Sequence, residues 1–102
     1  MKYIYLIQSQ EDGYYKIGVS KHPKKRIKEL QTGNSSELKL IWSFESEYPH
    51  LVERALQRRY DHLRKEGEWF DLSINEDVSF LTDCKEIDES IINLKKSGNI
   101  FI

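Results

Sequence analysis

The feature that most constrains the fold of this 102-residue chain is a predicted β-hairpin at its start. Residues 2–9 and 14–20 are rich in tyrosine and isoleucine, and aromatic and β-branched residues favour strands. The four residues between these segments end in Asp12-Gly13, and glycine supplies the positive φ angle that a short connection between antiparallel strands requires. We therefore expect the two segments to pair as antiparallel strands.

Hydrophobic spacing after the hairpin predicts a short helix, a third strand and a longer helix. The short helix, over residues 23–31, begins at Pro23, which suits a first helical position. Residues 38–44 alternate as a strand would, with one face formed by Leu38, Leu40, Trp42 and Phe44. Residues 49–65 carry an apolar stripe at helical spacing, formed by Val52, Leu56, Tyr60 and Leu63. The predicted fold class is α+β, a small three-stranded antiparallel sheet flanked by helices.

The C-terminal third of the chain predicts further helical structure. We expect residues 68–70 to pack back on the sheet, and Ser73 and Glu76 have the spacing of a capping box at a helix start. The apolar residues that follow predict one broken helix or two short ones. The chain is thus expected to form one compact unit, in which residues 1–72 are the functional domain and residues 73–102 are an acidic helical part packed on it.

Composition limits the class of protein. A chain of 102 residues with 38% hydrophobic residues fits one globular domain with a modest core. Cys84 is the one cysteine, which excludes an internal disulfide and a cysteine-rich zinc site and fits a reducing compartment. The sequence has no apolar stretch long enough for a signal peptide or for a membrane span of roughly 20 residues. We therefore expect a cytoplasmic protein that does not associate with membranes.

Charge is unevenly distributed along the chain. Residues 1–70 carry 13 Lys and Arg against 10 Asp and Glu, whereas residues 71–102 carry 3 against 7. The net charge of −1 argues against avid nonspecific binding of nucleic acid. Basic residues nevertheless cluster in 21–28 and again in 54–65. Two interpretations stay open, a solvated helix surface or a face that contacts phosphates, and the acidic end is a candidate for covering such a face.

Two tripeptides in the predicted hairpin form a pattern with two later residues. Residues 3–5 read Tyr-Ile-Tyr and residues 16–18 read Lys-Ile-Gly, and they are followed by Arg26 in the basic helix and Glu53 in the second helix. In this order the motifs resemble the GIY-YIG nuclease superfamily, which has Gly-Ile-Tyr and Tyr-Ile-Gly at the two tripeptides. The resemblance covers residues 2–71.

Further stretches narrow this resemblance to one branch of the superfamily. The form Lys-Ile-Gly is common in phage and large DNA viruses, and residues 30–35 (Leu-Gln-Thr-Gly-Asn-Ser) and 67–70 (Gly-Glu-Trp-Phe) are also similar to that branch. Family members often carry His or Tyr one helical turn after the arginine, where this chain has Leu30. A viral or phage origin would place the protein in the cytoplasm of the host cell.

The resemblance implies a catalytic centre formed by Tyr5, Lys16, Arg26 and Glu53. Tyr5, or a water held by Tyr5 and Lys16, would deliver the nucleophile, and which of the two acts as base stays open. Arg26 would present its planar guanidinium to phosphate oxygens, and Glu53 would bind one Mg²⁺ or Mn²⁺ ion that stabilises the leaving oxygen. Simpler interpretations are a surface pair of Arg26 with Glu29 and a favourable placement of Glu53 near a helix N-terminus.

The activity that this resemblance predicts is metal-dependent endonucleolytic hydrolysis of DNA phosphodiester bonds by a catalytic domain over residues 1–72. RNA stays open as a substrate, and a homodimer or a protein partner would supply specificity. Contacts to nucleic acid are expected from Lys21, Lys24, Lys25, Lys28, Asn34 and Arg58. The alternative is a catalytically weak or inactive module that binds nucleic acid or a protein partner, such as a phage accessory protein.

Overall fold

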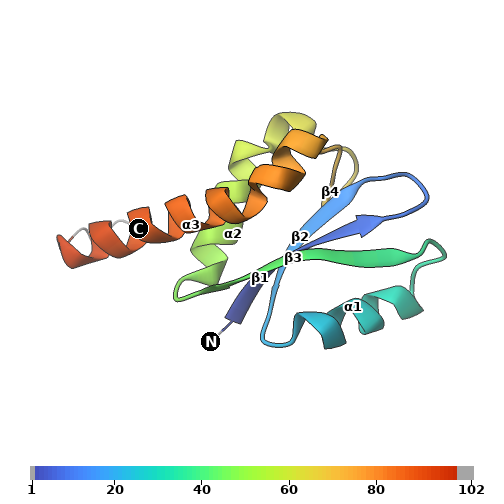
Figure 1. The fold of residues 1–102 in the computed structure, drawn as a ribbon, viewed down its shortest axis with the longest axis horizontal. Helices are drawn as coiled ribbons and strands as arrows, with labels where there is room; N and C mark the ends of the chain where they lie inside the picture. The colour runs from blue at the N-terminus through green and yellow to red at the C-terminus, as the bar shows by residue number, and fades with distance from the viewer. Residues whose placement is uncertain (1, 99–102) are drawn as a thin grey trace.

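The computed structural model describes residues 2–98, which form a four-stranded antiparallel sheet with helices on both faces (Figure 1). In chain order the elements are β1 (Lys2–Ser9), β2 (Tyr15–Ser20), α1 (Pro23–Thr32), β3 (Leu38–Ser46), α2 (Pro49–Arg59), a 3₁₀ helix (Asp61–Leu63), β4 (Trp69–Phe70) and α3 (Ile74–Lys96). The strands lie in the order β3-β1-β2-β4. α1 covers one face of the sheet, and α2 and α3 cover the other. The predicted α+β class is confirmed, with a short fourth strand beside the three expected ones.

The predicted hairpin is confirmed. β1 and β2 pair antiparallel along most of their length. In the connection between them Gly13 has a φ angle of 78°, and the Asp12 side chain accepts a hydrogen bond from the Tyr14 N–H at 3.0 Å. The Asp-Gly pair closes the turn because glycine adopts the left-handed conformation without strain and aspartate satisfies a backbone donor.

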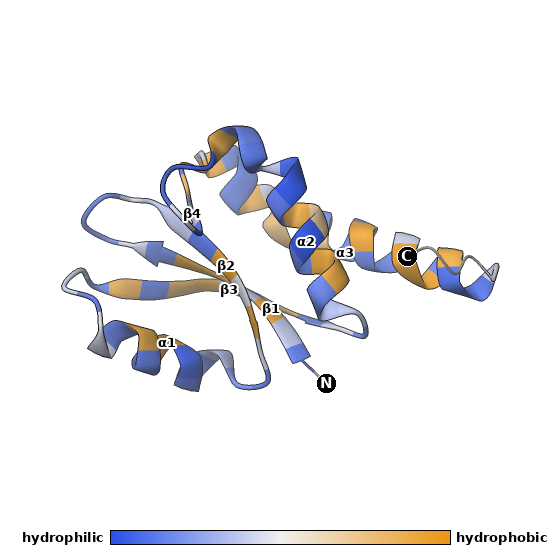
Figure 2. Cartoon of the chain, turned by 180° about the vertical axis from the view of Figure 1, so that it is seen from behind, coloured by the Kyte–Doolittle hydropathy of each residue, from blue (hydrophilic) through white to orange (hydrophobic). Residues whose placement is uncertain are grey.

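β1 is the centre of the fold because both of its faces are buried. Side chains alternate along a strand, so Ile4 and Leu6 point to one face and Tyr5 and Ile7 to the other. The first pair packs in the core with α2 and α3, and the second pair packs against α1. All four are at most 4% exposed. Hydrophobic residues accordingly lie along the strands and on the sides of the helices that face the sheet (Figure 2).

The ring of Tyr5 lies across Gly18, its partner on β2. A Cβ atom added at Gly18 would overlap the phenol oxygen and the Cζ atom of Tyr5. This close approach explains the glycine at the end of the second tripeptide, because any side chain there would displace the tyrosine ring.

The strand predicted after α1 is present as β3, but the prediction that its apolar residues share one face is wrong. The register of β3 against β1 shifts at Ile41, which is the extra residue of a β-bulge. Leu38 and Leu40 therefore pack toward α1. Phe44 instead joins the core on the opposite face, where the Trp42 indole N–H donates to α3. The bulge reverses the alternation of side chains on which the prediction rested.

α3 is one continuous helix of 23 residues, so the expectation of a broken helix or two short ones is wrong. Its buried residues form one uninterrupted stripe at helical spacing, at Phe80, Cys84, Ile87 and Ile91. The predicted capping box is present, with the Ser73 N–H donating to Glu76 Oε1 at 2.8 Å. Residues 99–102 of the predicted C-terminal part lie outside the described residues. No helix within residues 2–98 is both long and apolar enough to cross a membrane.

Acidic residues of α3 hold polar side chains of the elements packed against it. Three aspartates each accept a hydrogen bond from a hydroxyl group, in the pairs Tyr15–Asp77 at 2.5 Å, Tyr60–Asp83 at 2.6 Å and Ser46–Asp88. Burial, followed by the aspartate partner, raises the pKa of both tyrosines above the ordinary phenol value, so both remain donors. Since α3 lies on the face opposite α1, these carboxylates do not cover the basic residues of α1, whereas Asp83 does pair with Arg59 of the second basic cluster at 3.2 Å.

α2 ends at Arg59, earlier than the predicted boundary at residue 65. A 3₁₀ turn follows because the chain reverses direction there, and the Asp71 N–H donates to the Leu63 carbonyl at 2.7 Å. The reversal lets Trp69–Phe70 pair with β2, which confirms the expectation that this segment packs back on the sheet. The predicted apolar stripe of α2 is buried in the core at Val52, Leu56 and Tyr60.

Replacing Gly18 by alanine should displace the Tyr5 ring and lower the free energy of unfolding by about 1–3 kcal/mol, the usual cost of overpacking a core. In a Tyr5→Ala background the same replacement should cost much less, since the atoms that the new methyl group would meet are gone. Gly33→Ala is the matched control, because an added Cβ there meets nothing within 4 Å. Chemical denaturation measures each cost, and an equal cost of Gly18→Ala in both backgrounds would contradict the overlap.

Cys84 should be unreactive toward thiol reagents while the protein is folded. Its side chain is 0% exposed, and burial, followed by the charges of Asp83 and Asp88, raises the pKa of its thiol to about 12. Because the thiolate is the reactive form, a disulfide reagent such as DTNB should label the protein only as fast as the protein unfolds. Protein in guanidinium chloride gives the reference rate. Rapid labelling in native buffer would show that Cys84 is accessible.

Candidate functional site

Tyr5 and Lys16 lie on the same face of the sheet, on neighbouring strands. Tyr5 is opposite Gly18 and Lys16 is opposite Ile7, so the two side chains are diagonal neighbours on the α1 side. The Tyr5 ring is buried in the small core beneath α1, whereas the Lys16 side chain is 19% exposed. The hairpin register thus brings together Tyr5 and Lys16, two of the four predicted catalytic residues.

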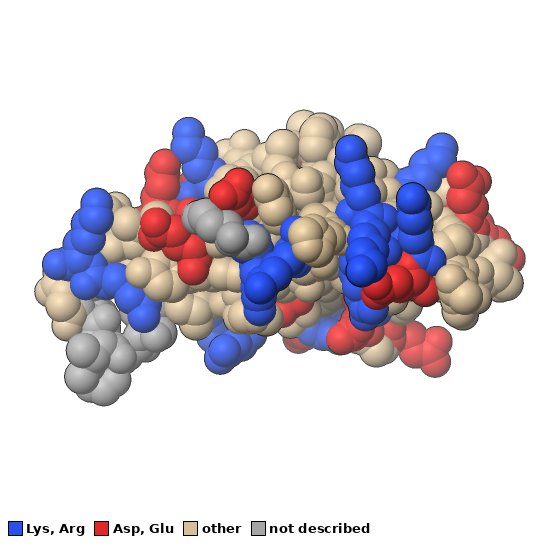
Figure 3. All heavy atoms as spheres, turned by 90° about the horizontal axis from the view of Figure 1, so that it is seen from below, with Lys and Arg blue, Asp and Glu red and all other residues tan. Residues whose placement is uncertain are grey.

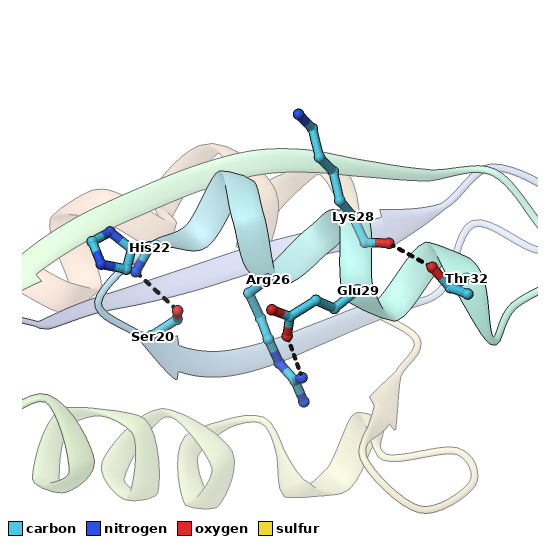
Figure 4. Close-up of polar contacts among 6 residues, drawn as sticks. All are labelled: Ser20, His22, Arg26, Lys28, Glu29 and Thr32. Atoms are coloured by element: carbon cyan, nitrogen blue, oxygen red, sulfur yellow. Dashed lines mark hydrogen bonds and ion pairs between the residues drawn. The ribbon is translucent and has the colours of Figure 1, made fainter.

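Arg26 reaches the same region from α1. Its side chain points across β2, whereas Lys28 points away on the other side of the helix (Figure 4). Arg26 Nη1 donates to Glu29 Oε2 at 3.2 Å, which is the helical surface pair of the simpler interpretation. Its pKa is raised first by the Tyr5 hydroxyl and then by Glu29, so the guanidinium lies near both groups. The surface pair with Glu29 is therefore confirmed, and the catalytic role of Arg26 stays a prediction.

Glu68 belongs to this site, although it is not among the residues predicted from the sequence. Its Oε2 atom lies 2.9 Å from Lys16 Nζ. The contact forms because the next residue, Trp69, is the partner of Lys16 in the pairing of β4 with β2. The pKa of Glu68 is lowered, first by its hydrogen bond with Lys16 and the charge of Lys16, and then by Arg64 and Arg26. A signal existed, since Glu68 lies in one of the family-like stretches, but the contact depends on a two-residue strand that hydrophobic patterns do not reveal.

Glu53 approaches the site from α2. It is half-buried, and its pKa is raised first by burial and further by the charge of Glu68, while His50 and Arg54 act in the opposite direction. The carboxylate of Glu68 therefore influences Glu53 on α2 and also Arg26 on α1. Glu68 links the two sides of the site electrostatically. We refer to the five residues of the site as the polar cluster, which comprises Tyr5, Lys16, Arg26, Glu53 and Glu68.

The polar cluster offers Glu53 as the ligand for the predicted divalent ion. Within residues 2–98, no group of three or more His, Cys, Asp and Glu side chains is arranged to hold a metal ion. Burial and the nearby Glu68 carboxylate both disfavour the charged form of Glu53. A cation bound to Glu53 would stabilise that charged form. Mg²⁺ is commonly held by one or two carboxylates together with water and substrate phosphate. Glu53 is therefore the residue of the polar cluster that could hold a Mg²⁺ or Mn²⁺ ion, with water as most of the other ligands.

Three of the predicted nucleic-acid contacts line a cavity at the start of α1. Lys21, Lys24 and Lys25 surround this cavity of about 630 Å³ together with Tyr3 and Leu40. The first turn of α1 contains no acidic residue, so the lysine charges add to the positive end of the helix dipole. Lys and Arg side chains stand out on this side of the molecule, with some acidic ones among them (Figure 3). This end of α1 is therefore suited to anionic ligands.

The other three predicted contacts are spread over the surface. Lys28 is exposed on α1 and points away from Arg26 (Figure 4). Asn34 lines a small cavity together with Lys16 on the α1 side of the sheet. Arg58 instead lines a groove between α2 and α3, which cover the opposite face. The structure therefore does not bring Arg58 together with the lysines of α1.

The chemistry available in the polar cluster is that of phosphate handling. Two cationic side chains can bind the oxygens of one phosphate group, and a phenol beside them can exchange a proton. A carboxylate nearby can hold a divalent ion. Such a combination stabilises negative charge that develops on phosphorus-bound oxygens.

A protein-family model, that of the T5orf172 domain, matches residues 2–91 of the chain. The match includes all four strands, α1, α2 and most of α3, and with them every residue of the polar cluster. No curated protein and no solved structure matches the chain. The T5orf172 domain is related to the GIY-YIG nucleases, which agrees with the resemblance found in the two tripeptides. The chain belongs to the T5orf172 domain family.

Proposed function

We propose that this protein is a metal-dependent endonuclease that hydrolyses phosphodiester bonds in DNA. The observation that carries the proposal is the convergence of Tyr5, Lys16 and Arg26 beside one face of the sheet. Glu53 is close enough that the charge of Glu68 affects both it and Arg26. The relation of the T5orf172 domain to the GIY-YIG nucleases supports this class of reaction.

In the proposed mechanism Tyr5 takes a proton from the attacking water and Lys16 binds the phosphate. Lys16 is paired with Glu68 at 2.9 Å, and an ammonium group has no free electron pair to accept a proton. Tyr5 lies beside the Arg26 guanidinium, and its phenol oxygen is the remaining candidate for the base. This arrangement favours Tyr5 over Lys16 as the base.

Arg26 and Glu53 would complete the reaction centre. The planar guanidinium of Arg26 would bind phosphate oxygens as the water oxygen bonds to phosphorus and the bond to the 3′ oxygen breaks. Glu53 would hold a Mg²⁺ or Mn²⁺ ion, which supplies charge for the leaving oxygen when it is bound. Leu30 stands where related nucleases often have His or Tyr, so the leaving oxygen would take its proton from solvent. The products would carry 5′-phosphate and 3′-hydroxyl ends.

The proposed substrate is DNA, with RNA as the other candidate. The lysine-lined cavity at the start of α1 would extend the phosphate contacts beyond the polar cluster. A homodimer or a protein partner would supply specificity, since a phosphate-based interface reads no sequence. The Lys-Ile-Gly form of residues 16–18 points to the phage and viral branch, and we propose the host cytoplasm as the place of action.

Supercoiled plasmid should be nicked by the wild type in Mg²⁺ or Mn²⁺, and Glu53→Gln should abolish this nicking. Folding raises the pKa of Glu53, so its ionised form opposes folding at neutral pH and its neutral form does not. Glu53→Gln should therefore be at least as stable as the wild type, and thermal unfolding of both proteins checks that a loss of cleavage does not come from unfolding. The readout is the conversion of supercoiled to relaxed plasmid, with EDTA as the metal-free control.

Glu89→Gln is the matched control for this experiment, because Glu89 is an exposed helical glutamate on α3. It should cleave as the wild type does. Metal-dependent nicking that persists in Glu53→Gln would remove Glu53 from the reaction. Absence of nicking by folded wild type on all DNA forms would remove the nuclease proposal.

The assignment of the base predicts different pH profiles for two variants. Tyr5→Phe should lower the cleavage rate by about 10²- to 10⁴-fold, the usual contribution of a general base, and should abolish the rise of rate with pH. Lys16→Met should weaken the apparent affinity for DNA and keep that rise, because the phenol is still present. Single-turnover rates over a pH series measure both effects. The reverse pattern would make Lys16 the base.

A second candidate function is a module that binds nucleic acid or a protein partner without catalysis. Both cations of the polar cluster are already paired with carboxylates, Lys16 with Glu68 and Arg26 with Glu29. Such pairing lowers the charge that is free to stabilise a transition state. Metal-independent DNA binding by folded wild type, without any cleavage, would favour this candidate.

A further inference from the structure

We propose that Glu68 occupies the phosphate-binding position of the polar cluster and that a phosphate group must displace it from Lys16 in order to bind. The inference rests on the proposed role of Lys16 and Arg26 in binding phosphate. It gives Glu68 the role of an internal anion that competes with the ligand and so sets the affinity of the site for phosphate.

The geometry of the ion pair is the first support. Glu68 Oε2 lies 2.9 Å from Lys16 Nζ, a distance at which a phosphate oxygen would also bind an ammonium group. The Lys16 side chain is only 19% exposed, whereas that of Glu68 is 66% exposed. Glu68 therefore covers Lys16 from the solvent side, which is the side from which a ligand arrives.

The surrounding charges are the second support. Lys16, Arg64 and Arg26 all stabilise the ionised form of Glu68, so its carboxylate lies among the cations that would bind a phosphate. Two anions in one such position repel each other and compete for the same donors. Binding of phosphate therefore requires the Glu68 carboxylate to leave Lys16.

The local backbone allows this exchange without a rearrangement of the sheet. Arg64 Nη1 donates to the Gly67 carbonyl at 2.9 Å, and the Trp69 N–H donates to the Glu66 carbonyl at 3.0 Å, so the chain is held on both sides of Glu68. The Glu68 side chain can then rotate away while its backbone stays in place. The exchange is easy because an ion pair with one exposed partner contributes little to stability.

Removing the charge of Glu68 should tighten the binding of phosphate. In Glu68→Gln the dissociation constant for inorganic phosphate should fall about three- to fivefold, the factor that corresponds to one exposed ion pair. The measurement is a titration with inorganic phosphate that is followed by NMR of the lysine side chains and the arginine Nε–H groups. The signals of Lys16 and Arg26 should shift together with one dissociation constant.

Glu66→Gln is the matched control, because Glu66 is also exposed, lies in the same turn and changes the net charge equally. It should bind phosphate as the wild type does. The dissociation constant for phosphate should be lower in Glu68→Gln than in Glu66→Gln. This difference should disappear when each variant is combined with Lys16→Met. Equal affinities of the two single variants, a gain that survives Lys16→Met, or no phosphate shift at Lys16 would each overturn the proposal.

The titration needs no cleavage of nucleic acid, so its result is separable from the proposed function. If Glu68 controls phosphate affinity in a protein that cuts no DNA, the nuclease proposal is wrong and the proposed role of Glu68 is supported. If the protein nicks DNA with metal but Glu68→Gln leaves phosphate affinity unchanged, the nuclease proposal is supported and the proposed role of Glu68 is wrong.

Discussion

The rest of the structure depends on the burial of β1 on both faces. β1 is a central strand of the sheet, helices cover both faces of the sheet, and the alternation of the β1 side chains divides them between two cores. α2 and α3 pack against Ile4 and Leu6, and the core on this face contains most of the buried hydrophobic residues. Tyr5 and Ile7 belong to the smaller core beneath α1, where little room exists between the layers. The Tyr5 ring fits there because Gly18 has no side chain.

The polar cluster follows from this layered arrangement. Tyr5 is fixed by the sheet, and α1 brings Arg26 to its hydroxyl group. The pairing of β4 with β2 adds Glu68 beside Lys16, and α2 contributes Glu53 from the other layer. A phenol, two cations and two carboxylates within electrostatic reach of one another keep the charge of the site nearly balanced. A balanced site binds phosphate less tightly than a purely basic one, which would suit the proposed nuclease because it must also release its product.

Local sequence signals predicted much of the fold, and they failed where distant segments determine the geometry. The hairpin at Asp12-Gly13 and the capping box at Ser73 are local features, and both are present as predicted. The face of β3 was predicted wrongly because the bulge at Ile41 arises from pairing with β1 and is not visible in the alternation itself. The grouping of Tyr5 with Lys16 followed from hairpin register, whereas Glu68 was missed because its contact needs the pairing of a two-residue strand.

The sequence by itself determined the hairpin, most of the other elements and four of the five residues of the polar cluster. Turn chemistry, hydrophobic spacing and the two tripeptides act within short segments, so they can be read without knowledge of the packing. Only the tertiary structure decided that α3 lies opposite α1 and holds Tyr15 and Tyr60 through its aspartates. It also decided that Glu68 pairs with Lys16. These contacts join residues far apart in the chain, and their positions depend on how the layers pack and not on the residues themselves.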